Sequence, residues 1–419
     1  MKWTSFDTRW MLSLFGTAVG AGILFLPIRA GTGGFYPVVV MTLLIFPMVW
    51  LSHRALSRFV NESQSTDHDI THAAEEYWGY GIGFFITLLY FFAIYPICLA
   101  YGVGITNTFA NFFVYQLQLT SLYDPDSMEL YPLVRAGLAF VLVSAMMSVM
   151  CFKVELVTKA CNALVYPLCA VLFCFSLYLI PHWKLESLQK VPSFKEFLEV
   201  IWLTLPVLVF AFNHSPAIST FTLSVRRQYE NSQEKANQIL FATSALLLVF
   251  VMFFVFSCIL CLDSEDFSKA RAANIPILSY FANQFDTPII ALGAPLVAFL
   301  AIVSSFFGHY FGAFEGLNGI VRKSIKMSSQ KTPNMKAIKV FSTLFLYISI
   351  ILVAYLNPSI LGFIEDLGGP IIAAILFLMP IIAIWSVAKL KQYKNPPLDI
   401  FVFVMGSLTI TSVVYKFFM

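Results

Sequence analysis

Long apolar runs of the sequence contain ionisable side chains, among them Lys159, His214, His309 and Glu315. A charge in apolar surroundings is costly, so each residue is a candidate for a functional role. A histidine titrates near neutral pH, which suits a group that binds and releases a proton. Each group also has a structural interpretation. His214 would be a neutral imidazole bonded to backbone carbonyls, Glu315 the partner of a nearby basic residue, and Lys159 a side chain reaching the nearest aqueous boundary.

Two apolar runs are interrupted near their middle by residues that disrupt helices. In the first, the segment Gly20–Gly22 precedes Pro27, and each glycine costs about 1 kcal/mol relative to alanine. In the second, the segment Phe212–Pro216 ends in a proline, which removes a backbone hydrogen bond. Freed amides bind carboxylates and freed carbonyls bind ammonium groups or cations, so paired interruptions indicate a site for a small solute. Glycine also serves as a close-packing residue, and for Gly16 that alternative stays open.

Polar residues also recur along the apolar run that contains Ser304, Ser305, His309 and Glu315. Ser305, His309 and Gly312 share one helix face, because they are spaced by four and three residues. Ser305 lies near the midpoint of the run. We expect its hydroxyl to contact a solute or to complete a cation site beside the first run.

A further candidate site consists of residues with opposite charges. Glu365 and Asp366 precede a Gly-Gly-Pro segment, and Arg29 ends the first apolar run. A charge pair across a water-filled entrance would close it, and water would solvate both groups when they separate. We therefore predict that Arg29, Glu365 and Asp366 form an outer gate.

Composition requires lipid around most of this chain. Hydrophobic residues make up 59% of its 419 positions and charged residues 12%, about half the charged fraction of soluble domains. Runs of this length cross a bilayer as helices, since barrel strands are short and alternate in polarity. We expect an all-α integral membrane protein of one membrane domain, with only loop-sized polar stretches at Asn61–Tyr80 and Asp263–Asp286. About eleven spans are predicted, near residues 10–30, 35–57, 82–114, 132–151, 154–180, 197–223, 237–262, 288–321, 337–355, 358–386 and 398–417.

The basic residues orient these spans. With the N-terminus in the cytoplasm, the inner loops hold about eighteen Lys and Arg residues and the outer loops about seven. An odd number of spans then places the C-terminus outside.

Several segments resemble a known family: TAVGAGILFLPIRAG, FPMVWLSHRALSRFV, FNHSPAIS, GHYFGAFEGLNG and ILGFIEDLGGPIIA. They are similar to the hydroxy and aromatic amino acid permease family and, within it, to the bacterial serine and threonine permease branch. The resemblance runs from about Asp7 to the end of the chain. The aromatic branch usually lacks the FNHSP sequence found here.

The resemblance implies a bacterial inner-membrane symporter with a five-plus-five inverted-repeat (LeuT-like) fold in which helices one and six are broken. The repeats would cover about residues 8–181 and 196–387, followed by an extra helix at about 398–417. The substrate would meet the backbone of the first break and a facing wall from the sixth span. The residues implied are Thr17, Gly20, Ala21, Gly22, Phe212, Asn213, His214, Ser215 and Ser305.

The resemblance also implies proton coupling. Proton-coupled relatives of this fold can hold a lysine where sodium-coupled ones hold sodium, which gives Lys159 a coupling role. His214, His309 and Glu315 are the further candidates.

We therefore expect import of a small amino acid, serine or threonine, by proton symport with alternating access. An aromatic substrate and sodium coupling stay open as alternatives. A channel would need a filter sequence and a membrane-embedded enzyme a motif such as H-E-x-x-H, and neither occurs. No cofactor, metal or nucleic acid is expected beside the substrate, the proton and the bilayer, and the oligomeric state is open.

Overall fold

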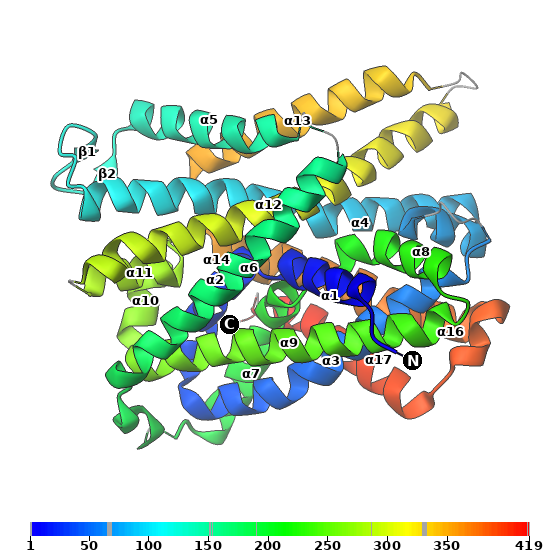
Figure 1. The fold of residues 1–419 in the computed structure, drawn as a ribbon, viewed down its shortest axis with the longest axis horizontal. Coiled ribbons are helices and arrows are strands. Elements are labelled where there is room, and N and C mark those ends of the chain that lie inside the picture. The colour runs from blue at the N-terminus through cyan, green and yellow to red at the C-terminus, as the bar shows by residue number, and fades with distance from the viewer. Residues whose placement is uncertain are drawn as a thin grey trace.

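The computed structural model describes residues 2–64, 69–150, 152, 154–189, 191–285, 287–328, 333–416 and 418, with the side chains of 154–162, 186 and 187 outside the description. Long helices run side by side along one axis (Figure 1). A short hairpin, β1 (Tyr123–Asp124) and β2 (Glu129–Leu130), lies at one end with α10 (Ser264–Ala272) and α11 (Ile277–Gln284). The N-terminus lies at the other end (Figure 1).

The described residues contain ten helices long and apolar enough to cross a membrane, or eleven when the bent pair α1–α2 counts as one span. The predicted number of about eleven spans is therefore confirmed. The spans are α1 (Ser5–Ala18) with α2 (Ala21–Ala30), α3 (Phe35–Asn61), α4 (Ile70–Asn111), α5 (Pro132–Val149), α6 (Val154–Leu179), α7 (Phe194–Ala211) with α8 (Ile218–Gln228), α9 (Ser232–Cys261), α12 (Pro288–Ser328), α13 (Met335–Leu356), α14 (Ile360–Gly362) continued by α15 (Gly369–Ala373) and α16 (Met379–Ser386), and α17 (Pro396–Lys416).

Helices form here because a chain in lipid must satisfy its backbone groups within the segment. Local signals set several of their ends. Ser193 and Glu196 form a capping box at the start of α7, and such a cap supplies acceptors for amides that lack helical partners. Asn357 ends α13 in the left-handed conformation, which asparagine tolerates better than most residues.

The stretch Asn61–Tyr80 was expected to be loop, but it is helical from Ile70 onward. Asp69 caps α4 by accepting the amide of His72 at 3.0 Å, so the helix starts at Ile70 rather than near residue 82. Gly79 has φ +80°, a conformation that strains other residues. It divides off residues 70–78, which we call the α4 arm. Asp263–Asp286 likewise contains α10, which begins at a capping box of Asp263 and Asp266, and α11, which begins after Pro276.

The packing places α1 and α2 at the centre of the bundle. Both contact α9 and α12, and α2 also packs against α7. α12 lies along α4, and α3 lies along α9 and α7. The two interrupted spans are therefore neighbours.

Candidate functional site

The first interruption separates α1 from α2. α1 ends at Ala18, α2 begins at Ala21, and the two axes differ by 56°. No side chain caps α2, so its first amides lack helical partners. A Cβ at Gly20 would collide with the side chain of Ser305 and the hydroxyl of Tyr101, so only glycine fits at this position.

Ser305 bonds to the end of α1. Its Oγ donates to the carbonyl of Thr17 at 3.0 Å, and the hydroxyls of Tyr101 and Ser305 are 2.6 Å apart. His309 lies one turn further along α12, with its Nδ1 2.9 Å from the carbonyl of Ser305. The predicted position of Ser305 beside the first span is thus observed, and Tyr101 is a partner that the sequence did not reveal.

The second interruption separates α7 from α8. α7 ends at Ala211, and residues Ser215–Ala217 form one 3-10 turn before α8 begins at Ile218. Asn213 Oδ1 accepts the amide of Ser215 at 3.0 Å, a local bond that competes with continued helix.

His214 stacks on a residue that sequence analysis overlooked, His53 of α3. The ring centroids are 3.5 Å apart and the rings are 7° from parallel. His53 Nδ1 lies 2.8 Å from the carbonyl of Val49, and His214 Nδ1 lies 3.1 Å from that of Phe212. A carbonyl only accepts, so each Nδ1 carries the proton and each Nε2 is an acceptor. The sequence did offer one sign of His53, because this ionisable residue lies within the second apolar span.

The two interruptions contact each other directly. A Cβ at Gly22 would lie 2.7 Å from the Cα of Ala211. Asn213 is 1% and His214 0% exposed. The wall predicted from the two breaks is therefore assembled in one place, and it is closely packed.

A cavity of about 590 Å³ starts beside this contact. Thr17 and Ser304 line it near the breaks together with Pro216, while Glu315 and Arg322 line it further along. Gly20–Gly22 and Phe212–Ser215 do not line this cavity. Of the predicted site residues, Thr17 and Glu315 are therefore accessible from it.

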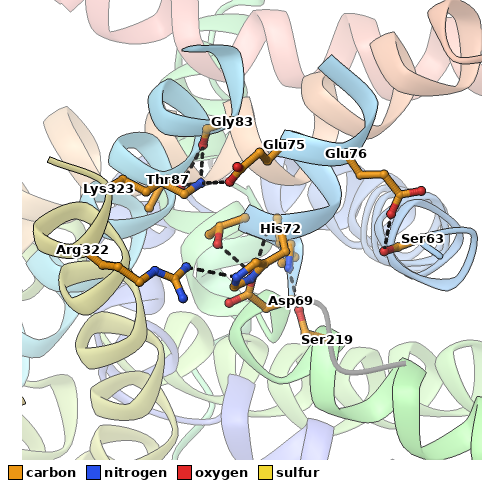
Figure 2. Close-up of polar contacts among 12 residues, drawn as sticks. Ser63, Asp69, His72, Glu75, Glu76, Gly83, Thr87, Ser219, Arg322 and Lys323 are labelled. Carbon is orange, nitrogen blue, oxygen red and sulfur yellow. Dashed lines mark hydrogen bonds and ion pairs between the residues drawn. The ribbon is translucent and has the colours of Figure 1, made fainter. Parts of the chain in front are cut away.

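The cavity ends among charged and polar groups, where Asp69, His72 and Arg322 form a chain (Figure 2). His72 Nδ1 lies 2.9 Å from Asp69 Oδ1, and Arg322 donates to His72 Nε2 at 3.0 Å. Burial alone would raise the pKa of Asp69, but hydrogen bonds from His72 and Thr71 lower it to about 2. Glu315 makes no hydrogen bond or ion pair with the described residues, so the basic partner considered for it is not found there.

The α4 arm is bound to α12 by a neighbouring ion pair (Figure 2). Lys323, 2% exposed, lies 3.0 Å from Glu75 and 3.0 Å from the hydroxyl of Thr87. Arg322 and Lys323 are adjacent on α12 but have different roles. Arg322 faces the cavity and Lys323 fixes its wall.

A fully buried ion pair joins the first span to α9. Lys235 Nζ lies 2.7 Å from Asp7 Oδ2, and both side chains are 0% exposed. The hydroxyl of Tyr229 donates to the other carboxylate oxygen of Asp7 at 2.9 Å. No local pattern in the sequence identified this pair.

At the opposite end of the bundle, Glu365 forms ion pairs with three cationic side chains. Arg29 Nε lies 3.6 Å from Glu365 Oε1, while Arg271 and Lys416 each lie 2.9 Å from Oε2. Glu365 is only 4% exposed. Asp366 contacts Lys416 at 2.7 Å. The structure thus brings Arg29 to Glu365 as predicted and adds Arg271 of α10 and Lys416 at the end of α17.

Lys159 lies in α6, but its side chain is outside the described residues. Among the described residues, no group of three or more His, Cys, Asp or Glu side chains is placed to hold a metal ion.

Comparison with known proteins places this geometry in a family. The model described as the tryptophan/tyrosine permease family matches residues 10–417. The serine transporter SdaC of Escherichia coli (strain K12) is 44% identical over 423 residues, covering 99% of this chain and 96% of SdaC. The threonine/serine transporter TdcC of Yersinia enterocolitica is 40% identical over 436 residues, covering 99% and 96%.

Two solved structures share the fold at low sequence identity. MhsT in complex with L-phenylalanine has a TM-score of 0.61 at 14% identity, covering 100% of this chain and 99% of MhsT. A mutant of the Eremococcus coleocola manganese transporter has a TM-score of 0.60 at 13% identity, covering 98% and 86%. These matches confirm the predicted fold class, and the relatives confirm the resemblance to the serine and threonine branch. The chain is a multi-pass permease rather than an enzyme, and it belongs to the tryptophan/tyrosine permease family.

Proposed function

We propose that this chain imports L-serine, L-threonine or both by proton symport with alternating access across a bacterial inner membrane. The observation that carries the proposal is the one-sided access to two contacting breaks. A cavity extends from the Arg322 end to Thr17 and Pro216, which adjoin the breaks, while ion pairs to the buried Glu365 occupy the opposite end. The relatives named as serine and threonine/serine transporters supply the substrate class.

The start of α2 suits the substrate carboxylate. A helix N-terminus presents free amides and a positive dipole end, and α2 has no side-chain cap. The carbonyl of Thr17, at the end of α1, suits the ammonium group. We place the other predicted substrate residues around these two, which requires the breaks to separate when the substrate enters.

Proton coupling is proposed for Glu315, with His214, His309 and Lys159 as the further candidates. Glu315 fits the role because it faces the cavity and has no partner among the described residues. A carboxylate that reaches water in one state and is enclosed in the other can carry one proton per cycle. Arg29, Glu365 and Asp366 would form the gate on the opposite side.

The proposed topology follows from the same arrangement. The Arg322 end is cytoplasmic with the N-terminus, and the Glu365 end faces outward with the C-terminus. The inverted repeats cover about residues 8–181 and 196–387, and α17 is the extra helix.

The test is uptake by purified protein in proteoliposomes. Labelled serine, threonine and tryptophan are supplied with either a proton or a sodium gradient. We expect serine or threonine to accumulate with the proton gradient, with acidification of the lumen. Tryptophan accumulation would favour the aromatic alternative, and accumulation with sodium alone would contradict proton coupling.

A further inference from the structure

Two polar atoms in the second break have no hydrogen-bond partner among the described residues: Nδ2 of Asn213 and Nε2 of His214. A buried polar group without a partner costs about 1–3 kcal/mol. Neighbouring residues that both leave such an atom unpaired indicate a ligand that pairs with them in another state.

The polarity of both atoms is fixed by their other contacts. Asn213 Oδ1 accepts the amide of Ser215, so Nδ2 is the free donor. His214 Nδ1 donates to the carbonyl of Phe212, so Nε2 is the free acceptor. The break thus presents one donor and one acceptor from adjacent residues.

His53 determines how His214 presents its acceptor. Its ring covers one face of the His214 ring at 3.5 Å. Its Nε2 accepts the backbone amide of His214 at 3.2 Å, a group that the end of α7 leaves without a helical partner. His53 itself is oriented by the carbonyl of Val49. The pair therefore fixes both the backbone and the ring of His214.

The free donor of Asn213 and the free acceptor of His214 restrict which ligand groups can bind to them. An ammonium group only donates and would face the Asn213 donor unfavourably, while a carboxylate only accepts and would face the His214 acceptor unfavourably. A hydroxyl both accepts and donates from one oxygen, so its chemistry matches both atoms. The start of α2 lies beside this segment, since Gly22 packs against Ala211.

We propose that Asn213 Nδ2 and His214 Nε2 recognise the side-chain hydroxyl of the substrate, and that His53 is the positioning residue for this pair. The proposal rests on the proposed function, because it deepens the assignment of a hydroxy amino acid. An apolar side chain would leave both buried atoms unpaired. The site is then selective for serine over alanine, which differs by that hydroxyl alone.

The experiment compares serine and alanine uptake in proteoliposomes. Sites built to bind a hydroxyl discriminate strongly against analogues that lack it, and we expect at least about a tenfold preference for serine in the unaltered protein. Asn213→Asp keeps the oxygen that accepts the Ser215 amide but replaces the donor. His214→Asn keeps a donor near Nδ1 but lacks Nε2. Both are expected to reduce the preference for serine over alanine to below about threefold.

Binding supplies a second measurement for any variant that transports poorly. The thermal shift that serine and alanine produce in detergent-solubilised protein is compared for the same variants. A serine preference that stays at the unaltered value in uptake or in binding overturns the hydroxyl assignment. Failure of the unaltered protein to take up serine and threonine overturns the proposed function, and this assignment with it.

His53 is tested by two isosteric variants. His53→Gln keeps a polar atom where Nε2 accepts the His214 amide, whereas His53→Asn does not reach that position. We expect His53→Asn to lose the serine preference and His53→Gln to recover at least part of it. Ser52→Ala is the matched control, because Ser52 bonds to the same Val49 carbonyl without contacting His214. Equal preferences in both His53 variants overturn the positioning role.

Discussion

The two ends of the bundle use charge in different ways. At the Glu365 end, one carboxylate collects Arg29, Arg271 and Lys416 from three separate segments. At the Arg322 end, ion pairs such as Asp7–Lys235 lie inside the wall, and the cavity between the walls stays lined by polar groups. The ion pairs thus close the Glu365 end. At the Arg322 end they lie within the packed helices that surround an open cavity.

This difference indicates which charges must separate during transport. Pairs within the wall connect segments that pack closely, so they serve stability. The Glu365 cluster lies where the first span, α10 and α17 converge, so it would have to open. Variants at the two ends should therefore change different quantities.

The largest effect is expected when the buried pair Asp7–Lys235 is broken. Lys235→Met leaves Asp7 charged without its partner, and breaking a buried pair costs about 3–5 kcal/mol. We expect a large decrease in the thermal unfolding midpoint, measured in detergent. The double variant Asp7→Leu with Lys235→Met should recover much of it. An unchanged midpoint in the single variant would show that the Asp7–Lys235 pair does not stabilise the fold.

The next largest effect concerns the Glu365 cluster. Glu365→Ala leaves three cations facing one another, so closure of this end becomes unfavourable. We expect serine uptake to fall on the order of a hundredfold, about 2.7 kcal/mol, with membrane abundance reduced less. Arg29→Ala should act in the same direction. Glu265→Gln is the control, since Glu265 is 77% exposed and pairs with Lys269, which is not part of this cluster. Normal uptake kinetics in both the Glu365 and Arg29 variants would reject the gate.

A smaller effect is expected at the rim of the cavity. The pKa of Asp69 is lowered to about 2 in the folded protein, below the ordinary value near 3.9. Its stabilising contribution is therefore complete above about pH 4 and is lost as the pH falls towards about 2. It amounts to roughly 2 kcal/mol. Asp69→Asn should reduce stability at neutral pH and flatten its decline in acid, measured by thermal unfolding against pH. The exposed Asp126→Asn is the control, and parallel curves for both variants would contradict this assignment.

The smallest effect is expected from Glu315→Gln. The side chain keeps its shape and loses only the ability to exchange a proton, so exchange of serine at equal pH should continue. We expect the severalfold stimulation of uptake by an imposed proton gradient to disappear. Asn318→Ala, which changes another residue of the cavity lining, should retain the stimulation. A Glu315→Gln variant that still responds fully to the gradient would move the coupling role to Lys159, His214 or His309.

Parts of the site were predictable because their signals are local. Gly20–Gly22 and Phe212–Pro216 weaken a helix within one turn of themselves, and the helices end beside both segments. Arg29 and Glu365 were assigned to the same side by counting spans, and their side chains meet. The α4 arm was missed because its start depends on one cap and its end on one glycine.

Other features depended on residues far apart in the chain. His53 and His214 are separated by 161 positions, and neither histidine alone indicates a stack. Arg135 of α5 donates to the carbonyls of Ala354 and Tyr355 and to Asn107. It thereby satisfies carbonyls at the end of α13, which no local pattern around Arg135 predicts.

The sequence by itself determined that this chain is embedded in a membrane, how many times it crosses the bilayer, and where two of its spans are weakened. These follow from the solvation of apolar side chains and from backbone bonding within a helix, both of which act locally. Only the tertiary structure decided that the two weakened segments touch, that His53 orients His214, and which end stays open. Those outcomes depend on how helices pack, and a packing contact is a property of two distant segments together.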